Sequence, residues 1–137
     1  MKKAISFVLL LAILSSCLFS AALAETRASN YFTSYGTTIG TPGSGRLSIT
    51  FKAVGTDICN QIGVATYQVQ RRDDAGNWED VSGLLSGQTG SNVASYTFGR
   101  YFQGVAGETY RVKVTFCCTI GTSSEYKSYT SGTVTAR

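Results

Sequence analysis

The sequence predicts an all-β domain, a single antiparallel sandwich of about seven strands, preceded by a helical export signal. After the first 24 residues the chain is rich in Thr, Ser, Gly, Tyr and Val, which favour strands and turns. Short runs that alternate apolar and polar residues follow one another between turn-forming segments. No segment after residue 24 carries apolar residues at the spacing of a helix.

Residues 1–24 have the composition of a signal peptide. Lys2 and Lys3 precede an apolar stretch, and Ala22-Leu23-Ala24 is a small-x-small cleavage site directly before Glu25. The apolar stretch is too short and wrongly flanked for a stable transmembrane helix. We therefore expect a mature, secreted domain of residues 25–137 without a membrane span.

A second interpretation of this segment concerns Cys17. Leu14-Ser15-Ser16-Cys17 resembles a bacterial lipobox, in which the cysteine carries a lipid anchor. The chain stays apolar from residue 18 to 24, whereas a lipoprotein usually turns polar after that cysteine. Cleavage after Ala24 is therefore favoured, and a surface lipoprotein anchored at Cys17 is the alternative.

The amino-acid composition of the mature domain limits the partners and the catalytic mechanisms that it can have. Loss of two lysines with the signal peptide leaves ten of the 12 basic residues against eight acids, a net charge of +2. No cluster of Lys and Arg indicates a nucleic-acid partner. The chain contains no histidine, which excludes Ser–His and Cys–His catalysis, so we expect a protein that is not an enzyme.

The strands are predicted in order, beginning with an irregular one over residues 31–39. The run at 46–54 directs alternate side chains to the core: Leu47, Ile49, Phe51 and Ala53. In the run at 65–72, one face of the predicted strand carries Tyr67, Val69 and Arg71, and the opposite face carries Gln68, Gln70 and Arg72. A turn at 73–77 then returns the chain as a hairpin over 77–83.

The second half of the domain continues the pattern. Strands are predicted over 95–102 and 108–118, and a more polar strand over 125–136. The strand at 108–118 directs one set of side chains inward: Tyr110, Val112, Val114 and Phe116.

Two segments resemble fibronectin type III domains. TYQVQRRDDAGNWEDV (66–81) is similar to their C–C′ hairpin, and SYTFGRYFQGVAGETYRVKVTF (95–116) to their E-to-F segment. The resemblance implies that Tyr110 is a tyrosine-corner residue, whose hydroxyl ties the chain ahead of its strand. Phe51 stands where the family usually has Trp, so the resemblance implies a fibronectin- or immunoglobulin-like sandwich. The whole chain also resembles short secreted proteins of Gram-positive bacteria that are grouped as a domain of unknown function.

Three cysteines remain after Cys17 is removed, and an exported chain meets oxidising conditions. In an immunoglobulin-like sandwich the connection that carries Cys59 lies at the same end as the close of the sixth strand. Alternate residues of the strand that begins near Tyr110 share a face, so Cys118 lies on the inward face with Tyr110 and Cys117 lies on the outward face. We therefore predict a Cys59–Cys118 disulfide and a free thiol at Cys117. A bulge at the end of the strand would instead pair Cys59 with Cys117 and leave Cys118 free.

Acidic and aromatic residues of the predicted hairpin have ordinary structural interpretations. Asp73 and Asp74 suit a turn, and Glu79 and Asp80 suit solvated positions. Neither these acids nor the cysteines have the spacing of a calcium or zinc site, so no metal or cofactor is expected. Trp78 is predicted to plug the core or its rim.

The remaining candidate site is a sheet face. If the strands at 65–72 and 108–118 are neighbours, they share an outward patch that carries no acid of its own: Gln68, Gln70, Arg72, Arg111 and Lys113. We expect a binding or cell-surface interaction module whose partner is a cell-wall polymer or an extracellular protein. A secreted antagonist of the bacteriocin type is the alternative, which a growth-inhibition assay against neighbouring bacteria would distinguish.

N-terminal sequencing of the exported protein tests the predicted cleavage. The expected first residue is Glu25, because the small-x-small site ends at Ala24. A diacylated Cys17 recovered from the membrane fraction would contradict this prediction and establish the lipoprotein.

Overall fold

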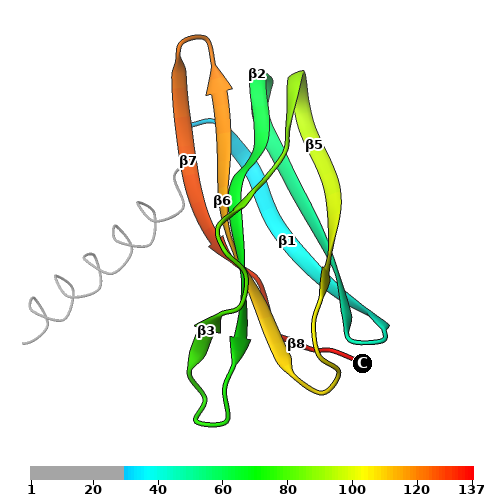
Figure 1. Ribbon diagram of the computed structural model, residues 1–137. Coiled ribbons are helices and arrows are strands. Elements are labelled where there is room, and N and C mark those ends of the chain that lie inside the picture. Colours follow the sequence, from blue (N-terminus) through cyan, green and yellow to red (C-terminus); the bar gives the residue numbers. More distant parts are fainter. Residues whose placement is uncertain (1–29) are drawn as a thin grey trace, which may run out of the picture. The chain divides into compact units, whose positions relative to one another are not determined.

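The computed structural model describes residues 30–137, and the predicted export signal lies outside this range. The described part of the chain is all-β, which confirms the predicted class. Its antiparallel strands form one curled sheet (Figure 1). The strands are β1 (Phe32–Gly43), β2 (Arg46–Arg72), β3 (Trp78–Asp80), β4 (Leu85–Ser86), β5 (Thr89–Gln103), β6 (Thr109–Ile120), β7 (Ser123–Thr130) and β8 (Val134–Thr135).

Strand β2 organises the sheet, because most other strands pair with it. Its first half pairs with β1 and with most of β5, and its second half pairs with β6, β3 and β4. The register against β5 shifts between Val54 and Cys59. Figure 1 shows β2 and β5 bending together at the top of the view, so that the two halves of β2 form opposite layers.

A connection between two separate strands is predicted around Cys59, and that prediction is wrong. The backbone remains extended through residues 46–72, and the change of direction is absorbed by the register shift. Gly55 permits the tight bend, because a Cβ atom there would lie 2.6 Å from the sulfur of Cys59.

The core lies between the two layers and includes the alternate residues that the sequence predicted, together with unpredicted members such as Ile62 and Val64. Aromatic rings join the layers: Phe51 and Tyr67, from opposite halves of β2, have centroids 5.0 Å apart. Tyr35 of β1 and Phe116 of β6 have centroids 5.4 Å apart. Burial of these alternate side chains is the main source of stability that this sheet offers. The fully buried members of the predicted sets include Leu47, Ile49, Phe51, Val69, Val112 and Phe116.

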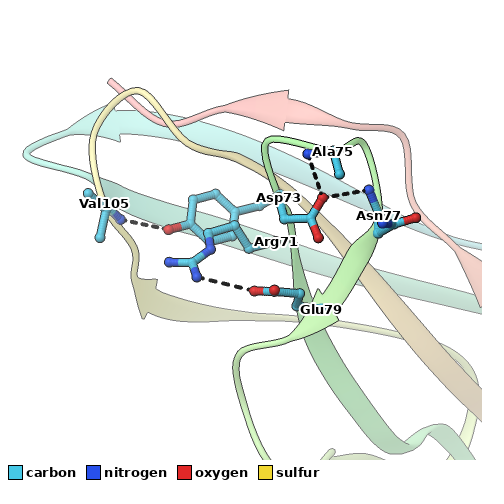
Figure 2. Close-up of polar contacts among 7 residues, drawn as sticks. Arg71, Asp73, Ala75, Asn77, Glu79 and Val105 are labelled. Atoms are coloured by element: carbon cyan, nitrogen blue, oxygen red, sulfur yellow. Dashed lines mark hydrogen bonds and ion pairs between the residues drawn. The ribbon is translucent and has the colours of Figure 1, made fainter.

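The turn between β2 and β3 is held by Asp73. Its carboxylate accepts hydrogen bonds from the backbone N–H groups of Ala75 (2.9 Å) and Asn77 (2.8 Å), as Figure 2 shows. Gly76 adopts a φ of 87°, which a residue without a side chain tolerates best. Asp73 is therefore a turn former, as predicted, and the turn fixes the register in which β3 returns along β2.

Tyr110 ties the loop ahead of β6 to the core. Its side chain is 2% exposed, and its hydroxyl accepts a hydrogen bond of 2.8 Å from the backbone N–H of Val105 (Figure 2). The two partners are five positions apart in the chain, so the bond closes a local loop, as a tyrosine corner does.

Replacing Tyr110 with Phe should lower the free energy of unfolding by about 1 kcal/mol, because it removes one hydrogen bond and leaves the Val105 N–H unpaired. The matched control is Tyr101→Phe, since Tyr101 is 70% exposed and should tolerate the change. Urea denaturation of the three proteins measures the difference. Equal midpoints for all three would contradict a structural role for the Tyr110 hydroxyl.

Candidate functional site

The structure brings the predicted patch together on the outer face of β2 and β6. Gln68 lies opposite Lys113 in the register of the two strands, and Gln70 lies opposite Arg111. Strand β3 adds a residue beside them, because Trp78 pairs with Arg72. We call this surface the cationic face and define it by six residues: Gln68, Gln70, Arg72, Trp78, Arg111 and Lys113.

Trp78 is partly buried on this outer face and does not belong to the core, so a place for it in the core is wrong. The guanidinium carbon of Arg111 lies 4.2 Å from the centroid of the indole ring, and that of Arg72 lies 5.9 Å from it. Both distances are in the range of cation–π attraction. The cause is the register of β3: Trp78 stands opposite Arg72, and paired residues of neighbouring strands point to the same face.

Gln70 is covered by its neighbours and positions Arg111. Its side-chain oxygen accepts a hydrogen bond of 2.8 Å from Nε of Arg111, and its nitrogen donates one of 2.7 Å to Asp80. Gln70 is consequently 7% exposed, although the sequence analysis placed it among the contact residues. Asp80 also brings an acid to the edge of a patch whose members on β2 and β6 include none.

The three cations of the face retain free donors. Within residues 30–137, the Arg111 side chain uses only Nε in hydrogen bonding, and the side chains of Arg72 and Lys113 have neither a hydrogen bond nor an ion pair. Arg71 differs, because it forms an ion pair of 3.3 Å with Glu79 (Figure 2). The fixed guanidinium of Arg111 and the two unpaired cations are therefore available to an anion.

A shallow hollow of about 250 Å³ continues the face beside Lys113. Hydroxyl-bearing side chains line much of it, and Leu84 adds an exposed apolar edge. The polar members of its lining are Thr66, Gln68, Lys113, Thr115, Ser128 and Thr130. The surface thus runs from an aromatic–arginine cluster through Lys113 to a row of hydroxyl groups.

The part of the chain that the structure describes contains neither a cluster of metal ligands nor a membrane-spanning helix. No group of three or more His, Cys, Asp or Glu side chains there is arranged to hold a metal ion. No helix there has the length and apolar character needed to cross a membrane.

The cysteines meet where β2 bends and β6 ends. The sulfur atoms of Cys59 and Cys118 lie 2.9 Å apart as thiols, and both residues are fully buried. Burial, followed by the hydrogen bond to Cys59, raises the pKa of Cys118 to about 12. Cys117 is partly exposed, and burial raises its pKa as well. Cys118 thus lies inside and Cys117 on the other face, as the alternation predicted.

Comparison with known proteins identifies no family for this chain. No family model and no curated protein matches the chain. Among solved structures, the chain is similar to a protein from Archaeoglobus fulgidus, with a TM-score of 0.42 and 16% sequence identity. The alignment covers 77% of this chain and 98% of that one. A similarity this weak supports no inference about function.

Oxidation should join Cys59 to Cys118, because each sulfur is the other's near neighbour and Cys117 faces away. Peptide mapping of the air-oxidised protein without reductant should recover this linked pair, with Cys117 labelled by an alkylating reagent. Recovery of Cys59 linked to Cys117 would contradict the assignment.

The reduced protein offers a second measurement of the same pair. A thiol whose pKa is raised by folding stabilises the fold below its ordinary value of 9.0, and this contribution is lost as pH rises from there toward about 12. We expect the reduced protein to lose stability above pH 9.0. The oxidised protein lacks that titrating thiol and should lose less over the same interval.

Proposed function

We propose that this protein is a secreted, non-enzymatic binding module whose cationic face holds an extended anionic polymer of the bacterial cell surface. The observation that carries the proposal is the Arg111–Trp78 pair, fixed by Gln70 and flanked by the unpaired cations Arg72 and Lys113. A guanidinium that is already oriented loses less freedom when it binds an anion.

We also propose that the curled sheet is a fibronectin type III-like or immunoglobulin-like sandwich. The pairing of β1 and β5 with the first half of β2, and of β3 and β6 with its second half, supports this interpretation. The hydroxyl of Tyr110 supports it as well. The sheet of such a sandwich is rigid, so the outward side chains of the cationic face stay at fixed distances from one another.

The layout of the face favours a polymer over a compact ligand. Arg111 and Lys113 are two residues apart on β6, which separates their backbones by about 7 Å along the strand. That spacing is comparable with the separation of successive phosphates in a poly(glycerol phosphate) chain. The hydroxyl-lined hollow beside Lys113 extends the surface in which a chain of repeating units finds hydrogen-bond partners.

Electrostatic attraction at this face is local. The mature chain carries a net charge of only +2. The three neighbouring cations of the face therefore concentrate more positive charge than the molecule carries as a whole. Charges in solvent act over about 10 Å at 0.1 M salt. Binding should therefore weaken strongly as salt is raised.

The test compares binding of poly(glycerol phosphate) and of neutral dextran to the immobilised protein at low and high salt. A variant with Arg72→Glu and Lys113→Glu should lose at least about tenfold in affinity for the phosphate polymer, because two attractions become repulsions. The variant should fold normally, since neither side chain has an ionic or hydrogen-bonded partner in the described structure.

The matched control carries Arg46→Glu and Arg137→Glu, which make the same change in net charge away from the cationic face. We expect this control to retain most of the affinity. Equal losses in both variants would show that net charge alone governs binding, and equal binding of dextran would show that anions are not recognised. Either result would overturn the proposal.

A further inference from the structure

A second outer face belongs to the layer that does not carry the cationic face. It is formed by β1, the first half of β2 and β5 (Figure 1). Leu47, Ile49 and Phe51 of β2 are buried, so the residues that alternate with them and the residues paired with those point outward. We call this surface the threonine face and define it by six residues: Thr38, Ser48, Thr50, Lys52, Thr97 and Tyr101.

The register of the three strands sets the outward residues in rows across the face. In the central row, Thr50 of β2 lies between Thr38 of β1 and Gly99 of β5. The side chains of the face are exposed except for that of Ser48, which is partly buried. Three outward positions are glycines, which keep the floor of the face low: Gly36, Gly40 and Gly99.

Hollows open at the two ends of this face. The hollow at the Lys52 end has a volume of about 350 Å³, and Thr50 and Thr97 contribute to its lining. The hollow at the Arg46 end has a volume of about 290 Å³ and is lined in part by Gln103. Arg46 and Lys52 are six positions apart on β2, which separates the two ends by about 20 Å. The threonine face and its hollows therefore form a trough that is long enough for several units of a chain.

The polar side chains of the trough have no partners within the protein. In the part of the chain that the structure describes, the hydroxyl groups of Thr38, Thr50 and Thr97 form no hydrogen bond, and Lys52 forms neither a hydrogen bond nor an ion pair. Segments 36–40, 46–52 and 97–103 contain no acid. Since the outward cations stand at the two ends, the middle of the trough offers neutral hydroxyl groups, which both donate and accept hydrogen bonds.

Tyr101 adds an open aromatic ring to the middle of the trough, where it pairs with Ser48. Its side chain is 70% exposed, and the guanidinium carbon of Arg46 lies 5.1 Å from the ring centroid. Cation–π attraction to Arg46 steadies the ring and leaves most of its surface open. An apolar ring beside a row of hydroxyl groups matches a pyranose sugar, which has C–H groups on its faces and hydroxyl groups around its rim.

We propose that the threonine face binds one neutral glycan chain of a few sugar units, extended along β2. One sugar ring lies on Tyr101, and the hydroxyl groups of the following units pair with Thr50 and Thr97. Gly99 lets the chain approach the threonines closely. The site does not depend on the function proposed for the cationic face, because it lies on the other layer and requires no anion.

The experiment is an NMR titration of the full protein with cellotetraose and, in parallel, with isomaltotetraose. Both are chains of glucose, but the β-linked chain of cellotetraose is extended, whereas the α-linked chain of isomaltotetraose, which is that of dextran, is flexible. Cellotetraose should shift the amide signals of Thr50, Lys52 and Tyr101. It should bind at least about fivefold more tightly than isomaltotetraose, because a chain that is already extended loses less freedom on binding. Its affinity should change little with salt, since no ion pair is formed.

Variants of Tyr101 test the stacking surface. Tyr101→Ala should bind cellotetraose about fivefold more weakly, and Tyr101→Phe, which keeps the ring, should bind as the native protein does. The matched control is Tyr126→Ala, because Tyr126 is 62% exposed and lies outside the threonine face, on β7. We expect no loss of affinity in this control.

Gly99→Ile tests the low floor of the trough. A Cβ atom at Gly99 would lie 3.5 Å from its nearest neighbour, the carbonyl oxygen of Ile49, which is an ordinary contact. The variant should therefore fold and melt at the same or a higher temperature, because a β-branched residue suits a strand, yet lose cellotetraose binding. Unchanged binding in Gly99→Ile, equal losses in Tyr101→Ala and Tyr126→Ala, or equal affinity for the two glucose chains would overturn the proposal. Cellotetraose shifts confined to other surfaces would also overturn it.

Discussion

The bend of β2 between Val54 and Cys59 determines where the other strands lie. One continuous strand supplies both layers, so β1 and most of β5 attach to one layer while β6 and β3 attach to the other. The bend requires close approach at Gly55 and brings Cys59 against Cys118 at the end of β6. Contacts such as Phe51 with Tyr67 then hold the layers together from the inside.

Most of the apolar side chains lie in the core, so the outer faces of the sheet carry mainly polar and charged side chains. On one outer face, the turn at Asp73 fixes how β3 returns along β2 and thereby places Trp78 beside Arg72. Arg111 reaches the same ring from β6 and is held by Gln70. A structural turn thus positions an aromatic ring between two guanidinium groups.

Alternation along the strands predicted the core and the inward position of Cys118, because period-two patterning reports which face of a sheet is buried. It did not predict the continuity of β2, since an extended bend carries no turn residues that distinguish it from a connection. It also misplaced Trp78 and Gln70, whose surroundings depend on the register of β3.

The proposed binding of an anionic polymer across the Trp78–Arg111 pair is tested most directly by NMR. The protein is titrated with short poly(glycerol phosphate) chains, and the indole N–H of Trp78 and the Nε–H of Arg111 are observed. These two signals should shift first and together, with smaller shifts at Lys113 and none at Tyr101. Shifts confined to other surfaces, or none at the indole at saturating polymer, would contradict it.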